Sequence, residues 1–65
     1  MRYKIEIWQY YNITATHESD DIQDILSWYR SNWHHAYEMG YCAFDIYEDE
    51  RLLSFEEELE FGFHH

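Results

Sequence analysis

Apolar and polar side chains alternate over residues 2–11, which is the pattern of a β-strand with one buried face. Tyr3, Ile5 and Ile7 share the face that would be buried, with Tyr11 as a further candidate. The opposite face carries Lys4, Glu6, Trp8 and Tyr10. Residues 12–18 follow neither a strand period nor a helix period strongly, so they are predicted to form a connection or a fraying strand end.

Residues 20–39 have the period of an amphipathic helix. Their apolar positions follow the i, i+3, i+4, i+7 spacing: Ile22, Ile25, Leu26, Tyr29, Trp33, Ala36 and Tyr37. Asp20 and Gln23 have the spacing of a capping box, and further acidic side chains lie at the same, positive end of the helix dipole. Gly40 stands where a left-handed C-cap is expected. The pattern predicts one helix over residues 20–39.

Alternation returns in residues 41–48 and 52–61, which are predicted to pair as a hairpin. The turn is expected at Asp49 and Glu50. This register places two apolar pairs on one face: Ile46 with Leu53, and Phe44 with Phe55. A slip of one residue would break that match, so the register is well specified.

Together these segments predict one α+β domain over residues 1–65, with the element order β-α-β-β. The third strand runs past the end of its hairpin partner and is expected to pair with the first strand as well. The prediction is therefore a three-stranded sheet with strand order 1-3-2. One helix would cover one face of this sheet and leave the other face bare.

The bare face is predicted to combine aromatic rings with carboxylates. On a strand, Glu56, Glu58 and Glu60 would recur every ~6.7 Å, which is twice the rise per residue. Phosphates of a duplex strand recur every ~3.4 Å of helix axis, and their separation along the winding backbone is of similar order to that carboxylate spacing. Such a row can present a nucleic-acid-like charge pattern to a basic groove, with rings beside it as anchors. An ordinary solvated sheet face is the alternative interpretation.

Charge and size narrow the class of function. Fourteen Asp plus Glu against four Lys plus Arg leave a formal net charge of −10, which favours basic partners over nucleic acid or anionic membranes. The single cysteine, Cys42, cannot close an internal disulfide. The first residues lack an apolar signal core, and no apolar run approaches the ~20 residues of a membrane span. A soluble, cytoplasmic protein is expected.

Catalytic and metal chemistry are not predicted. His34 and His35 would point about 100° apart on a helix, so they cannot both bind one ion as an i, i+4 pair does. His64 and His65 end the sequence, and Cys42 falls on the apolar side of its strand. Paired carboxylates that act in glycoside chemistry need a cleft, and a sheet this small leaves little room for one. We expect no enzyme, no metal and no cofactor.

In size, acidity and abundance of Tyr and Trp, the chain resembles small phage-encoded inhibitors such as anti-CRISPR and antirestriction DNA-mimic proteins. The resemblance implies a non-catalytic inhibitor that occupies a basic, nucleic-acid-binding groove of a bacterial target. The alternative is a structural or regulatory homo-oligomer that associates through its aromatic sheet face, and a homodimer stays open. The residues expected to contact a partner are Trp8, Tyr10, Asp45, Tyr47, Glu48, Asp49, Glu50, Glu56, Glu58 and Glu60.

Overall fold

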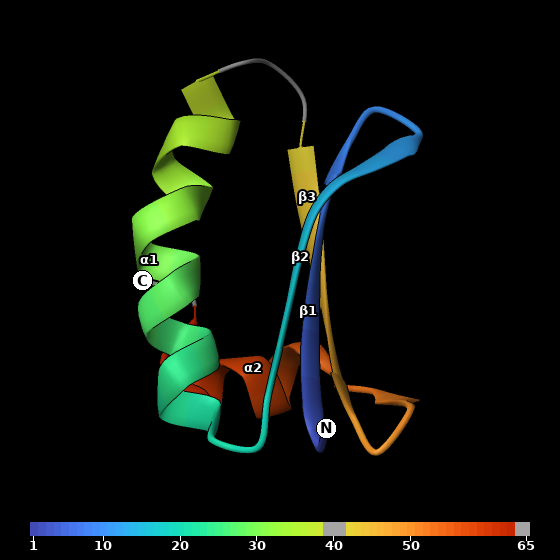
Figure 1. The fold of residues 1–65 in the computed structure, drawn as a ribbon, viewed down its shortest axis with the longest axis vertical. Coiled ribbons are helices and arrows are strands. Elements are labelled where there is room, and N and C mark those ends of the chain that lie inside the picture. The colour runs from blue at the N-terminus through green and yellow to red at the C-terminus, as the bar shows by residue number, and fades with distance from the viewer. Residues whose placement is uncertain (39–41, 64–65) are drawn as a thin grey trace.

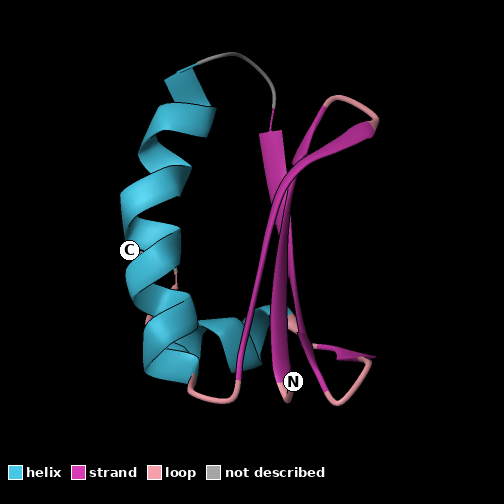
Figure 2. Ribbon diagram, viewed as in Figure 1, coloured by secondary structure: helices cyan, strands magenta, loops and turns pink. Residues whose placement is uncertain are grey.

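The protein is described by a computed structural model that covers residues 1–38 and 42–63. Six elements follow one another along the chain: β1 (Tyr3–Gln9), β2 (Asn12–Ser19), α1 (Ile22–Glu38), β3 (Cys42–Glu48), β4 (Arg51–Leu52) and α2 (Phe55–Phe61). The strands form one antiparallel sheet in the order β2-β1-β3-β4 (Figure 1). Figure 2 shows both helices on the same side of this sheet.

Strand β1 is one of the two inner strands of the sheet, with β3 as the other. It pairs with β3 from Tyr3–Glu48 to Gln9–Cys42, and with β2 from Tyr3–Ser19 to Gln9–Asn12. The β1–β2 register shifts between Ile7 and Trp8, which marks a β-bulge. β4 extends the far edge by only two residues.

The core lies between the sheet and the helices. Its buried members are Tyr3, Ile5, Ile25, Leu26, Tyr29, Ile46, Leu53 and Phe63. Ile5, Ile25, Ile46 and Phe63 are fully inaccessible to solvent. Of the residues that the sequence pattern assigns to the inner faces of β1 and α1, Tyr3, Ile5, Ile25, Leu26 and Tyr29 pack together, because each period places them on one side of its element.

Helix α1 begins close to its predicted start, but its cap is Asp21 rather than Asp20. The Gln23 backbone N–H donates to Asp21 Oδ1 at 2.9 Å, and the Asp24 N–H donates to the Asp21 carbonyl. The predicted Asp20–Gln23 capping box is therefore wrong, and Asp20 Oδ1 instead accepts a hydrogen bond from the Arg2 N–H at 2.9 Å. The predicted C-cap, Gly40, lies outside the described residues.

The segment predicted as a third long strand, 52–61, is instead mostly helix α2. Ser54 Oγ accepts from the Glu57 N–H at 3.2 Å while the Glu57 carboxylate accepts from the Ser54 N–H at 3.0 Å, a complete capping box. Gly62 ends the helix with φ 95°, a left-handed conformation that glycine adopts without a steric penalty. The αL turn brings Phe63 back into the core, where it is fully buried.

The predicted three-stranded sheet of order 1-3-2 with one helix is therefore wrong. Residues 12–19 form strand β2, and α2 replaces most of the predicted last strand, so the sheet has four strands in the order 2-1-3-4. The expected turn at Asp49 and Glu50 is present, and the Leu53 N–H donates to the Ile46 carbonyl at 2.8 Å. The predicted Phe44–Phe55 pair does not exist, since Phe55 opens α2 and is 61% exposed.

The β3–β4 turn holds two side-chain-bearing residues in the left-handed region, with φ 50° at Asp49 and φ 69° at Glu50. Such turns favour Asn-Gly, because each L residue there costs about 1–2 kcal/mol and glycine avoids that strain. We expect the double substitution Asp49→Asn/Glu50→Gly to raise the free energy of unfolding by about 1 kcal/mol after the entropy cost of glycine. Thermal and urea unfolding will measure the change.

The matched control is Asp49→Ala/Glu50→Ala, which removes the same two charges but keeps both strained positions. If the control gains as much stability as the Asn-Gly variant, relief of charge repulsion rather than backbone strain is the cause.

Candidate functional site

One side of the sheet is not covered by either helix. Phe61 and Phe63 pack with Tyr3 and Tyr29 on the side where α1 lies, which leaves the opposite side open. We call this side the open face. The strand registers place on it Lys4, Glu6 and Trp8 from β1, Ile13, Thr16 and Glu18 from β2, Ala43, Asp45 and Tyr47 from β3, and Leu52 from β4.

Apolar and aromatic side chains form part of the open face. Ile13 is 45% exposed and Leu52 is 53% exposed, although both are large aliphatic residues. Trp8 lies between Ile13 and Ala43 in the sheet, and Tyr47 lies between Lys4 and Leu52. The Trp8 indole Nε1 is buried without a hydrogen-bond partner in the described part of the chain. The face therefore offers rings and aliphatic groups that a partner can cover.

Carboxylates lie between these apolar groups. Glu6 and Asp45 face each other across the β1–β3 pair, and Lys4 Nζ lies 3.4 Å from Glu6 Oε2. With Glu18, the open face holds three carboxylates against one ammonium group. Partial burial, together with the negative charges of Glu6 and Asp45, raises the pKa of Tyr47 above its ordinary value. The tyrosine thus stays a neutral hydroxyl on an acidic surface.

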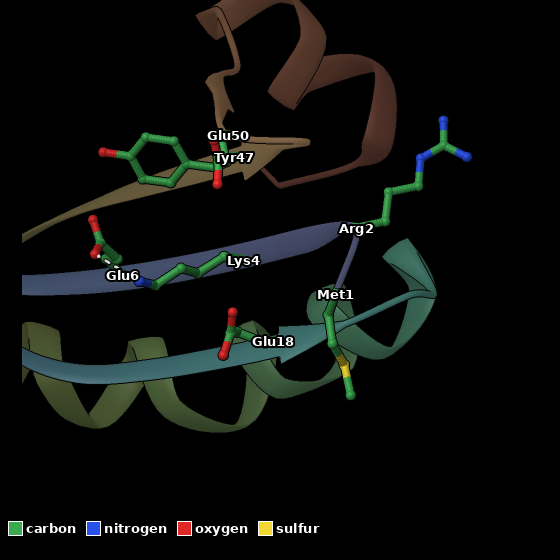
Figure 3. A pocket seen from close by; sticks show the side chains of 7 residues that line it. All are labelled: Met1, Arg2, Lys4, Glu6, Glu18, Tyr47 and Glu50. Carbon is green, nitrogen blue, oxygen red and sulfur yellow. Dashed lines mark ion pairs between the residues drawn. The ribbon is translucent and has the colours of Figure 1, made fainter.

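A pocket of about 380 Å³ opens on this face (Figure 3). Its walls come from the N-terminus, from all three long strands and from the β3–β4 turn: Met1, Arg2, Lys4, Glu6, Glu18, Tyr47 and Glu50. In Figure 3 the Lys4–Glu6 ion pair runs along β1, and the Tyr47 side chain projects from the neighbouring strand. Three of the lining residues are acidic and two are basic. The pocket is therefore suited to bind a polar or charged side chain of a partner protein.

The structure brings together part of the predicted contact set. Trp8, Asp45 and Tyr47 share the open face, as predicted, because their strands and parities are those expected. Tyr10 lies in the β1–β2 turn with φ 57° and 62% of its surface exposed. Glu50 lines the pocket from the other turn.

Two further predicted contact residues lie around the β3–β4 turn. Glu48 has the opposite parity to Tyr47 and forms an ion pair with Arg2, whose Nη2 lies 2.7 Å from Glu48 Oε2. Asp49 lies in the turn itself and is 4.0 Å from Arg2 Nε. Glu48 is therefore engaged inside the molecule, whereas Asp49 is exposed at the tip.

The predicted row of Glu56, Glu58 and Glu60 does not exist. All three lie on α2, where Glu58 is buried at 8% exposure while Glu56 and Glu60 point to solvent. A helix does not space alternate residues evenly along one face, so the carboxylates cannot form the ~6.7 Å repeat of a strand. The duplex-like charge spacing is thereby overturned, and these residues leave the candidate site.

Glu57, the fourth acidic residue of this segment, forms hydrogen bonds within the fold. Arg51 Nη1 and Nη2 bind its two carboxylate oxygens at 3.0 and 2.7 Å, and the Ser54 N–H donates to the same group. The Arg51 hydrogen bonds, followed by those of Ser54, lower the pKa of Glu57 to about 2. This bidentate pair joins β4 to the start of α2.

Sequence reasoning missed the β2 contribution to the open face, namely Ile13, Thr16 and Glu18. A usable signal was present, because β-branched residues recur in the segment at Ile13, Thr14 and Thr16. The two-residue turn at Tyr10 and Tyr11 lacks the Asn-Gly or Gly-X pair that is typical of a hairpin turn, so the sequence did not indicate it. The bulge also changes the parity of the strand.

The remaining chemistry is structural or lies outside the described residues. His17 stacks on Trp28 with 5.3 Å between ring centroids, and its Nε2 lies 3.0 Å from Asp24 Oδ2, so it ties β2 to α1. Within residues 1–38 and 42–63, no three His, Cys, Asp or Glu side chains are grouped to hold a metal. In the same ranges, neither helix has the length and apolarity needed to cross a membrane.

Comparisons with known proteins found no relative of this chain. No protein-family model matches the sequence, and no curated protein or solved structure matches the chain. The functional conclusions therefore rest on the residues of the open face and on the charge of the chain.

Proposed function

We propose that this chain is a non-catalytic binding protein that docks its open face on a basic surface of a partner protein. The partner surface we propose is the groove of a nucleic-acid-binding protein, which the chain would block as an inhibitor. The observation that carries the proposal is the coincidence, on one uncovered face, of Trp8 and Tyr47 with Glu6, Glu18 and Asp45.

Charge and apolar surface would act at different stages of binding. The net charge of −10 attracts a basic surface over distance and raises the association rate. Once in contact, rings that become fully covered supply most of the affinity and slow dissociation. The open face offers both kinds of group, and the resemblance in size and composition to phage-encoded inhibitors makes a nucleic-acid groove the first surface to test.

The test begins with capture of a partner on the immobilised chain from a nuclease-treated bacterial lysate, with identification by mass spectrometry. Surface binding to the purified partner is then measured at two salt concentrations. Glu18→Gln/Asp45→Asn should slow association by about tenfold at low salt and flatten the salt dependence. Tyr47→Ala should instead speed dissociation by about 30-fold and leave the salt dependence unchanged.

The matched control is Glu56→Gln/Glu60→Gln, which removes two exposed carboxylates from α2 and leaves the open face intact. An equal loss of association rate in both double variants would mean that only total charge matters, and the open face would not be the docking surface. Duplex DNA should compete with the chain for the partner. Binding that DNA does not reduce would exclude a nucleic-acid groove as the target.

A further inference from the structure

The pocket on the open face is built around one row of the sheet. Glu18 of β2, Lys4 of β1 and Tyr47 of β3 lie directly opposite one another in the strand registers. Neighbouring strands are about 4.8 Å apart, so Glu18 and Tyr47 are separated by about 10 Å across β1. Glu50 lines the same pocket from the β3–β4 turn. At about 380 Å³ the pocket is near the lower end of the roughly 300–1,000 Å³ of ligand sites, so it suits one long side chain.

The two basic side chains of the lining are already paired within the chain. Lys4 Nζ lies 3.4 Å from Glu6 Oε2, and Figure 3 shows the Lys4 side chain running along β1 toward Glu6. Arg2 Nη2 lies 2.7 Å from Glu48 Oε2, and in the same figure the Arg2 guanidinium points away from the other labelled side chains. Both positive charges are therefore balanced by carboxylates of the chain itself.

Two carboxylates of the lining have no such partner. Among the residues that the structure describes, no ion pair or hydrogen bond engages the side chain of Glu18 or Glu50, and both residues are exposed. The ring of Tyr47, which lines the same pocket, is partly buried. Carboxylates bind a cation through charge-assisted hydrogen bonds, and the face of an aromatic ring attracts the same cation. The pocket therefore combines two kinds of group that bind a cationic side chain.

We propose that this pocket binds the guanidinium group of a single arginine of the partner protein, stacked on Tyr47 and donating to Glu18 and Glu50. The inference rests on the proposed function for the source of the arginine, because a basic nucleic-acid-binding surface carries many arginines and lysines. Arginine presents a planar fork of N–H donors that stacks on a ring, whereas lysine presents a point charge. The pocket should therefore select arginine over lysine.

A titration with short capped peptides tests the pocket without any partner protein. The peptides are Gly-Arg-Gly, Gly-Lys-Gly and Gly-citrulline-Gly, in which citrulline keeps the shape of arginine but carries no charge. Backbone amide shifts of the complete, isotope-labelled chain are followed by NMR at low salt. The arginine peptide should shift the amides of Lys4, Glu18 and Tyr47 with a Kd of about 1 mM. It should bind at least about fivefold more tightly than the lysine or the citrulline peptide.

Two kinds of variant separate charge from ring contact. Glu18→Gln/Glu50→Gln should weaken binding of the arginine peptide at least about tenfold. Tyr47→Leu should weaken it about fivefold, whereas Tyr47→Phe, which keeps a ring, should stay within about twofold of the parent chain. The matched control is Glu56→Gln/Glu60→Gln, which removes the same number of charges from α2 and should weaken binding less than about twofold.

The inference is overturned if the arginine peptide binds no more tightly than the lysine and citrulline peptides. It is overturned as well if the control variant loses as much affinity as Glu18→Gln/Glu50→Gln. The proposed function would survive either result, because the open face can dock on a basic surface without an arginine in the pocket. Conversely, a lysate that yields no partner would count against the proposed function alone, since the peptide titration involves no partner protein.

Discussion

Replacing Phe63 by alanine is expected to lower the free energy of unfolding by about 3–5 kcal/mol. The ring is fully buried, and it contacts Tyr29 with 5.3 Å and Phe44 with 6.3 Å between ring centroids. A domain of this size has a total stability of about 3–10 kcal/mol, so the loss takes most of it. Urea unfolding followed by tryptophan fluorescence will measure the change.

Phe55→Ala is the control for this prediction, since the same ring is removed from a position that is 61% exposed. Its effect should stay below about 1 kcal/mol. If the two variants melt at the same temperature, the αL turn at Gly62 does not bring Phe63 into the core in solution.

The second large effect is expected from Trp33→Ala, which should cost about 3 kcal/mol. The indole packs edge-on against Phe44, with 4.9 Å between centroids, and lies beside Tyr29 at 5.7 Å. The cost falls at the lower end for a buried aromatic because the side chain is only partly buried. Chemical denaturation of the variant, with its midpoint and slope, gives the measurement.

Trp33→Phe separates packing from other effects of the change. Phenylalanine keeps a ring against Phe44, so Trp33→Phe should lose less than half of the stability that Trp33→Ala loses. A loss as large in Trp33→Phe as in Trp33→Ala would show that the indole itself, and not ring contact with β3, is required.

The elements predicted correctly are those whose pattern extends over several periods. The stripe from Ile22 through Trp33 defines α1 to within two residues of its observed start, and the contact of Trp33 with Phe44 follows from its phase. The alternation in β1 is likewise long enough to fix which side is buried. For this reason the sequence also places Trp8 correctly on the open face.

One missed element, α2, is short, and its sequence carries two compatible patterns. In residues 55–61, Leu59 and Phe61 fit an alternating strand, while Phe55 and Leu59 fit the i, i+4 spacing of a helix. Ser54 and Glu57 are the capping pair that decides between them, together with Gly62 at the end. Without the helix, Glu58 was assigned to solvent, although it is buried.

The position of β1 in the sheet has a consequence for the rate of folding. Its pairing with β3 joins residues far apart in the chain, from Gln9 with Cys42 to Tyr3 with Glu48. Because the loop entropy is lost before such contacts form, topologies with distant pairing fold more slowly than local ones. The β1–β2 hairpin joins neighbouring segments and can form early. The other edge of β1 stays unpaired until β3 is brought to it. Substitutions at the β1–β3 junction, such as Ile46→Val, should therefore slow folding more than they speed unfolding.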